Sequence, residues 1–107
     1  MKRGELVTIA LQGDFGKPRP ALVIQSDLFE AHPSMVILPI TSELRETPLF
    51  RVTVNPDGLN GLQKRCQVMV DKPQTVAREK LGPAFGRLGD DSMLAVTRAL
   101  ALFLGFA

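Results

Sequence analysis

The stretch KPRPALVI, residues 17–24, decides the fold, because a continuous apolar run follows an arginine bracketed by two prolines. The run at residues 21–24 is typical of a strand buried on both faces. A second run, at residues 35–40, predicts another such strand. Pro39 lies inside it and predicts a free edge or a bulge, because proline has no backbone N–H to donate. The centre of the chain is therefore expected to be a buried β-sheet.

Shorter patterns on either side extend this sheet. Residues 6–11 form a short apolar segment, and alternating apolar residues predict half-buried strands over 50–54 and 66–70. Residues 55–58, Asn-Pro-Asp-Gly, are a strong turn signal.

The C-terminal segment has helical spacing instead. Its apolar stripe would comprise Leu94, Thr97, Leu100, Ala101 and Leu104. Residues 90–92 offer N-caps, and Gly105 can close the helix. We therefore expect a mainly β (α+β) fold, a small, strongly bent β-barrel with a C-terminal helix, as one domain over residues 1–107.

Composition narrows the function. The chain has 107 residues and a net charge of +2, a mild hint of an anionic partner. Its single cysteine, Cys66, and single histidine, His32, exclude an internal disulfide and a zinc cluster. Motifs for nucleotide or metal sites are missing, so we expect no cofactor and no metal. No stretch suits a signal peptide or a membrane span, which predicts a cytoplasmic protein.

Arg19 is the first candidate for chemistry. Pro20 biases its backbone away from helical geometry, and Pro18 restricts the residue before it. The arginine thus has a stiff mount at the start of a buried strand. A rigid guanidinium suits phosphate recognition, because its planar fork donates two parallel hydrogen bonds. A solvated arginine on a rigid loop is an equally good interpretation of this segment alone.

Thr41 and Ser42 are the second candidate, since residues 36–40 form an apolar strand that delivers two hydroxyls at its end. Taken alone, these residues are better explained as the start of a turn. Cys66 falls on the apolar face of its strand and is better explained as a core residue than as a nucleophile.

Four blocks together resemble the PemK/MazF family, toxins of toxin–antitoxin modules that cut RNA. They are residues 3–5 (RGE), 17–27 (KPRPALVIQSD), 38–42 (LPITS) and 68–72 (VMVDK), in this order over most of the chain. The resemblance implies an SH3-like barrel, a homodimer and a metal-independent, sequence-specific endoribonuclease acting on single-stranded RNA. It also implies that Arg19 and Thr41 are the catalytic pair.

The residues could support attack of a ribose 2′-OH on the adjacent phosphate. A guanidinium stays protonated near neutral pH, so an arginine serves better as a stabiliser of phosphoryl charge than as a base. Thr41 would donate a hydrogen bond or position the 2′-OH, and a carboxylate such as Glu43 or Asp71 could take the proton. The predicted substrate-binding residues are Lys17, Ser42, Asp71, Lys72 and, for base stacking, Phe15.

The main alternative is a CcdB-like toxin that poisons DNA gyrase without catalysis. That activity depends on a Trp-Gly-Ile ending, whereas this chain ends Leu-Gly-Phe-Ala at residues 104–107. A toxin of either kind implies a cognate antitoxin, whose flexible acidic tail a basic groove would attract.

Overall fold

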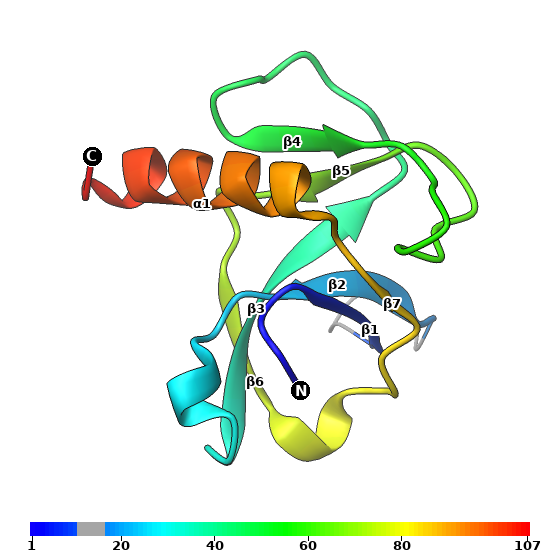
Figure 1. Cartoon of the computed structure of the whole chain (residues 1–107), viewed down its shortest axis with the longest axis vertical. Coiled ribbons are helices and arrows are strands. Elements are labelled where there is room, and N and C mark those ends of the chain that lie inside the picture. The colour runs from blue at the N-terminus through cyan, green and yellow to red at the C-terminus, as the bar shows by residue number, and fades with distance from the viewer. Residues whose placement is uncertain (11–16) are drawn as a thin grey trace.

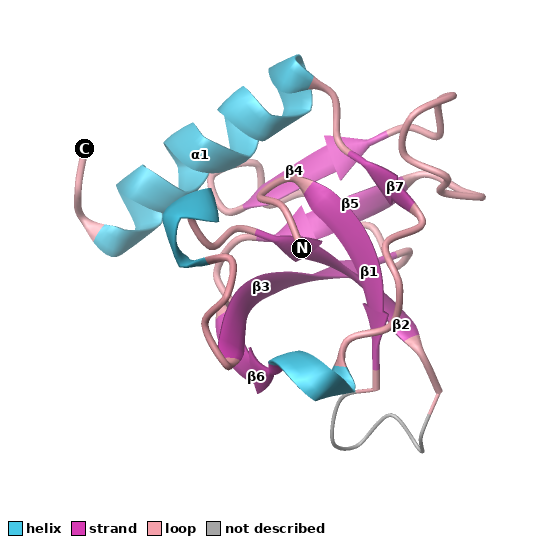
Figure 2. Ribbon diagram, turned by 60° about the horizontal axis from the view of Figure 1, so that its bottom comes forward, coloured by secondary structure: helices cyan, strands magenta, loops and turns pink. Residues whose placement is uncertain are grey.

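The computed structural model describes residues 1–10 and 17–107, and Figure 1 shows strongly curved strands with one long helix lying beside them. In chain order the elements are β1 (Glu5–Ile9), β2 (Arg19–Val23), the 3-10 turn η1 (Asp27–Phe29), β3 (Ser34–Thr41), β4 (Arg51–Val54), β5 (Cys66–Met69), β6 (Gln74–Ala77), the 3-10 turn η2 (Arg78–Lys80), β7 (Gly86–Arg87) and α1 (Asp90–Leu104). Figure 2 shows the strands bent into a half-barrel. The predicted small, mainly β barrel with a C-terminal helix is confirmed.

Strand β3 organises the sheet, whose order is β4-β5-β3-β2-β1-β7 with β6 on β3. On one side β3 pairs with β2. On the other side its first half, Ser34 to Ile37, pairs with β6, and its last residues, Ile40 and Thr41, pair with β5. Between them, Leu38 and Pro39 have no partner residue in β5 or β6. The free edge predicted from Pro39 is confirmed, and the sheet bends where β3 changes partners.

Two apolar layers cover the two faces of the central strands. Leu6, Leu22 and Leu38 lie opposite one another across β1, β2 and β3 and belong to the core that α1 covers. The neighbours of Leu22, Ala21 and Val23, belong to a second core on the other face. Residues 21–23 are therefore buried on both faces, as the apolar run predicted.

The helix α1 confirms the predicted position but corrects the predicted face. Val96 is its one fully buried side chain, and Met93, Ala99 and Leu100 pack around the same core. Leu94 is 48% exposed, so the stripe proposed through it was wrong. α1 is apolar on more than one face, and only packing against β4 selects which face is covered.

The ends of α1 also differ from each other. Gly105 closes the helix in the left-handed conformation, with φ of 85°, as predicted. At the start, Gly89 is the N-cap and no side chain caps it, so the predicted capping by residues 90–92 was wrong. Asp90 and Asp91 lie in the first turn instead, where a negative charge interacts favourably with the helix dipole.

The predicted strands were nearly right in extent. β2 begins at Arg19, earlier than the apolar run suggested, and the strands predicted over 50–54 and 66–70 are found as β4 and β5. The short strands β6 and β7 were not predicted, because neither shows a run of alternating apolar residues. The end of the first predicted strand, Leu11, lies outside the described residues.

Candidate functional site

The strand register brings four polar side chains into one row across the sheet. The β2–β3 pairing runs as far as Ala21 opposite Pro39, and two residues further along the two strands stand Arg19 and Thr41. Thr41 is in turn paired with Gln67 of β5, and Gln67 with Thr53 of β4. Residues opposite one another in antiparallel strands point to the same face. Side chains far apart in the sequence therefore lie on one face of the sheet.

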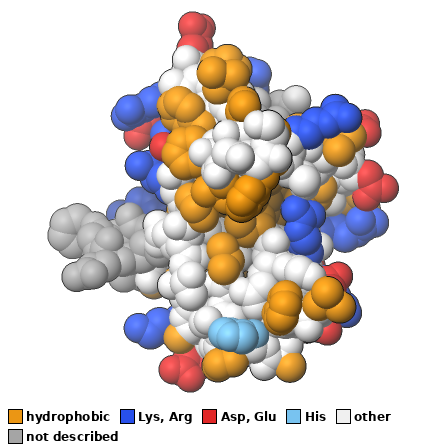
Figure 3. Space-filling model, turned by 90° about the vertical axis from the view of Figure 1, so that its left-hand side faces the viewer, with side chains coloured by type: hydrophobic (Ala, Val, Ile, Leu, Met, Phe, Trp, Pro, Cys, Tyr) orange, Lys and Arg blue, Asp and Glu red, His pale blue; other side chains and the backbone are white. Residues whose placement is uncertain are grey.

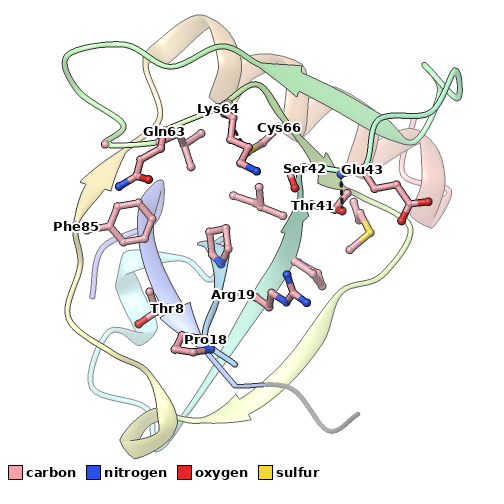
Figure 4. Close-up of a pocket in the computed structure, with 16 residues that line it drawn as sticks. Thr8, Pro18, Arg19, Thr41, Ser42, Glu43, Gln63, Lys64, Cys66 and Phe85 are labelled. Atoms are coloured by element: carbon pink, nitrogen blue, oxygen red, sulfur yellow. Dashed lines mark hydrogen bonds between the residues drawn. The ribbon is translucent and has the colours of Figure 1, made fainter. Parts of the chain in front are cut away.

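A cleft of about 850 Å³ opens at the Arg19–Thr41 end of this row. Its walls come from the ends of β2 and β3, from the loop before β5 and from the segment before β7. The lining residues are Thr8, Pro18, Arg19, Pro20, Pro39, Ile40, Thr41, Ser42, Glu43, Gly61, Leu62, Gln63, Lys64, Cys66, Met69 and Phe85. Figure 4 shows the labelled side chains arranged around this hollow.

Arg19 is the first residue of β2 and its side chain is exposed in the cleft. Its backbone is held by Pro18 and Pro20, and it stands in register with Ile9 of β1. The stiff mount predicted from the sequence is thus continuous with the sheet. In Figure 4 the guanidinium extends toward the side of the cleft that carries Thr41.

Thr41 is the last residue of β3 and starts a turn. Its Oγ1 accepts a hydrogen bond from the backbone N–H of Glu43 at 3.0 Å. The interpretation of Thr41 as a turn residue is therefore correct, and the same turn places the hydroxyl in the cleft. A hydroxyl that accepts one bond keeps its own proton to donate. Ser42, beside it, is also exposed to the cleft.

A loop pinned by a buried asparagine forms another wall. Asn60 is fully buried, donates from Nδ2 to the carbonyl of Asn55 at 2.9 Å and accepts from the N–H of Leu62 at 3.0 Å. Gly86 of β7 packs so closely here that a Cβ would lie 2.4 Å from the Asn60 carbonyl oxygen. These contacts hold the loop at Asn60, and the next residues of the loop, Gln63 and Lys64, line the cleft.

The charges that line the cleft are two cations and one carboxylate, within the residues that the structure describes. Arg19 and Lys64 are the cations. Glu43 is the carboxylate, and it forms an ion pair with Arg45 at 3.0 Å in which both side chains are largely exposed. Of the two carboxylates predicted as proton acceptors, Glu43 lines the cleft and Asp71 does not.

Cys66 lines the cleft beside Lys64 and belongs to the core. Its side chain is 5% exposed, and its Sγ donates to the carbonyl of Lys64 at 3.1 Å. Burial raises the pKa of the Cys66 thiol, with a smaller opposing effect of Lys64. A thiol held neutral is a poor nucleophile, so the core interpretation is confirmed.

Of the other predicted substrate-binding residues, Lys17, Asp71 and Lys72 do not line the cleft. Lys17 is exposed beside Pro18. Asp71 and Lys72 follow β5 and form an ion pair with each other at 3.9 Å. Phe15, the predicted stacking residue, lies outside the described residues.

Three lining residues had no sequence signal that marked them. Thr8, Gln63 and Phe85 come from β1 and from two loops, and only the folded chain collects them at one cleft. Phe85 is 39% exposed and offers a flat apolar surface there. The sequence could have drawn attention to Phe85 as an aromatic residue next to Gly86. It could not show that Phe85 lies at the same cleft as Arg19 and Thr41.

Among the residues that the structure describes, no group of three or more His, Cys, Asp or Glu side chains could hold a metal ion. None of the described helices has the length and apolarity needed to cross a membrane.

An arginine and a threonine hydroxyl in one open cleft of a small half-barrel can both donate hydrogen bonds to a phosphate group. A family model described as PemK-like, MazF-like toxin of type II toxin–antitoxin system matches residues 2–104. The chain therefore belongs to this family of toxins, whose members are endoribonucleases.

Individual relatives agree with this assignment. The chain is 41% identical over 108 residues to a probable endoribonuclease MazF of Mycolicibacterium smegmatis, covering 100% of this chain and 99% of that protein. Its structure resembles the Mycobacterium tuberculosis toxin MazF-mt6, with a TM-score of 0.80, 25% identity and coverage of 94% and 96% of the two chains. An endoribonuclease in complex with its cognate antitoxin, from mycobacterial species, shares the fold with a TM-score of 0.81, 23% identity and coverage of 100% and 97%.

Proposed function

We propose that the chain cuts single-stranded RNA at specific sequences without a metal ion, and that Arg19 and Thr41 carry the reaction. One observation supports this most: the strand register and the cleft bring these two residues together from β2 and β3. Neither residue alone is distinctive. Together they supply a fixed cation and a hydroxyl donor at one open surface.

The proposed reaction is attack of a ribose 2′-oxygen on the adjacent phosphorus. The new P–O bond forms as the bond to the 5′-oxygen of the next nucleotide breaks, which leaves a 2′,3′-cyclic phosphate and a 5′-hydroxyl. The 2′-OH loses its proton and the departing 5′-oxygen gains one. Negative charge grows on the phosphoryl oxygens in the transition state, and Arg19 stabilises it there. Thr41 donates to a phosphoryl oxygen or holds the 2′-OH.

Glu43 is the proposed acceptor of the 2′-OH proton. Among the described residues it is the carboxylate that lines the cleft, and its backbone N–H donates to Thr41 Oγ1. Lys64, at the opposite wall, adds positive field along the phosphate backbone. Lys17 and Lys72, outside the lining, are proposed to attract RNA at longer range.

Sequence specificity would come from the walls of the cleft. Phe85 offers a stacking surface, and the amide of Gln63 can both donate and accept hydrogen bonds at a base edge. Metal independence is supported by the site itself, since its charge stabilisation comes from side chains.

We propose two protein partners. A second copy of the chain would cover the exposed apolar residues at the end of α1, of which Leu102 is 52% and Phe103 48% exposed. Figure 3 shows hydrophobic side chains gathered on the face toward which this end points.

The second proposed partner is a cognate antitoxin, whose acidic segment would bind the cationic cleft. The mycobacterial endoribonuclease of similar fold, which is seen in complex with its cognate antitoxin, supports this proposal. We further propose that the protein acts in the cytoplasm, where it would find its RNA substrate.

The test is cleavage of RNA by the purified protein in EDTA. We expect cutting at a recurrent motif, mapped by sequencing the 5′ ends, and cyclic phosphate at the 3′ ends of the fragments. A 2′-deoxy nucleotide at the mapped position should block cutting there. Cutting of that substrate, or activity only after Mg²⁺ is added, would contradict the proposal. The gyrase-poison alternative predicts intact RNA, and the match to the PemK-like, MazF-like model does not favour it.

A further inference from the structure

We propose that Gln67 is a positioning residue that holds the Thr41 hydroxyl in its working orientation. This inference rests on the proposed function, because it concerns the same cleft. Gln67 is 6% exposed and stands directly opposite Thr41 on β5. It does not line the cleft but faces a second hollow beside Arg45 and Arg51, so its route to the Thr41 hydroxyl runs through the chain segment that follows Thr41.

The amide of Gln67 uses its full hydrogen-bonding capacity. Its Oε1 accepts from the backbone N–H of Arg45 at 2.9 Å and from Nη1 of Arg51 at 3.2 Å. Its Nε2 donates to the carbonyl of Arg45 at 2.9 Å and to Oγ1 of Thr53 at 3.2 Å. An amide offers two donors and two acceptor sites, and all four are occupied. The group is therefore fixed in one orientation.

These bonds clamp the turn that follows Thr41. Gln67 holds both backbone polar groups of Arg45, while Arg51 donates from Nη1 to the carbonyl of Glu43 at 2.9 Å. The N–H of Glu43 in turn donates to Thr41 Oγ1 at 3.0 Å. Glu43 is thus held at its carbonyl by the clamp, and its N–H occupies one acceptor site of the catalytic hydroxyl. The clamp decides where the proton of that hydroxyl can point.

The consequence is a rate effect without a binding effect. A loosened turn would let the Thr41 hydroxyl leave its position, and misplacement by about 1 Å can cost on the order of 10² in rate. Arg19 and Lys64 would still attract the RNA. We expect Gln67→Met, which keeps the size and removes the polar atoms, to lower kcat about tenfold or more with little change in KM.

The test is a double-mutant cycle between Gln67→Met and Thr41→Val, read as single-turnover cleavage of a mapped RNA. If Gln67 acts through Thr41, Gln67→Met should slow the wild type but have little further effect when the hydroxyl is already gone. Equal slowing in both backgrounds, as a general structural defect would give, overturns the proposal. Normal rates for Gln67→Met overturn it too.

Two further measurements guard against a folding defect. The amide of Glu43 should be protected from hydrogen exchange in the wild type and lose protection in Gln67→Met, while the amides of β1 stay protected. Thr53→Val removes one bond of Gln67 that does not reach the turn, so this matched control should keep kcat within about twofold. A large loss in Thr53→Val would overturn the proposal.

The cycle also separates this inference from the proposed function. Slow cleavage by Thr41→Val with normal cleavage by Gln67→Met refutes the positioning role alone. Normal cleavage by Thr41→Val refutes both.

Discussion

Replacing Arg19 by alanine should slow RNA cleavage by about 10²–10³-fold without unfolding the protein. The side chain is exposed at the start of β2 and belongs to neither apolar core, so its loss leaves the packing intact. Pro18 and Pro20 keep the backbone stiff in the variant.

The magnitude follows from the role assigned to the guanidinium. Removing one group that stabilises charge in a transition state costs about 10²–10³ in rate, or about 2.7–4 kcal/mol. Thr41 and Lys64 remain in the cleft and should preserve the residual activity. Arg19→Lys keeps the charge but loses the planar fork, so its rate should fall between those of wild type and Arg19→Ala.

The assay is single-turnover cleavage of an RNA that contains the mapped motif, in EDTA and at fixed salt. Lys17→Ala is the matched control, because it removes a nearby exposed cation that does not line the cleft. Exposed charges contribute about 0–1 kcal/mol, so this variant should lose at most about fivefold. Its loss should shrink at high salt, whereas the loss in Arg19→Ala should persist.

Two results would refute the assignment of Arg19. One is a rate for Arg19→Ala within about fivefold of wild type. The other is a loss in Arg19→Ala that disappears when the RNA is saturating, because that result would make the arginine a binding residue with no part in the chemical step.

Three further predictions concern the hydroxyl, the core and the thiol. Thr41→Val should cut about 10²-fold or more slowly because the donor is gone, whereas Thr41→Ser should stay within about tenfold, as measured in the same cleavage assay. Leu22→Ala should lower the free energy of unfolding by about 2–5 kcal/mol in urea titrations, because Leu22 is fully buried between β1 and β3. Leu28→Ala is the control: its side chain is 89% exposed, so the free energy of unfolding should change by less than about 0.5 kcal/mol. Cys66 should react with iodoacetamide more slowly than a free thiol at pH 8, and its rate should rise only at higher pH, because burial raises its pKa; rapid labelling of the folded protein would contradict this.

The same raised pKa has a consequence for stability. An unfolded chain would ionise Cys66 at a lower pH than the folded one, so the unfolded state binds fewer protons between the two pKa values. The neutral Cys66 thiol therefore makes its full contribution to the free energy of unfolding when the pH is below the thiol pKa of the unfolded chain. That contribution is lost as the pH rises through the pKa of the thiol in the folded protein. Cys66→Ser should show a smaller loss of stability on the alkaline side in urea titrations.

The fold was largely predictable because its main strands carry local patterns. The apolar run at 21–24 predicted a strand buried on both faces, and Pro39 predicted the interrupted edge of β3. The helix face was not predictable in the same way. α1 is apolar around much of its surface, so periodicity could place the helix but could not choose Val96 over Leu94 as the buried residue.

The candidate site divides along the same line. The stiff mount of Arg19 and the hydroxyls after the strand at 36–40 are local features, and the sequence by itself determined them. Tertiary structure decided that Arg19 and Thr41 line one cleft, because the β2–β3 register depends on pairing between residues far apart in the chain. It also decided that Gln67 holds the turn after Thr41, since the four bonds of that amide go to Arg45 in the turn and to Arg51 and Thr53 of β4. Local sequence patterns predict backbone geometry and burial. A site depends on the distances between segments that are far apart in the chain, and only long-range strand pairing sets those distances.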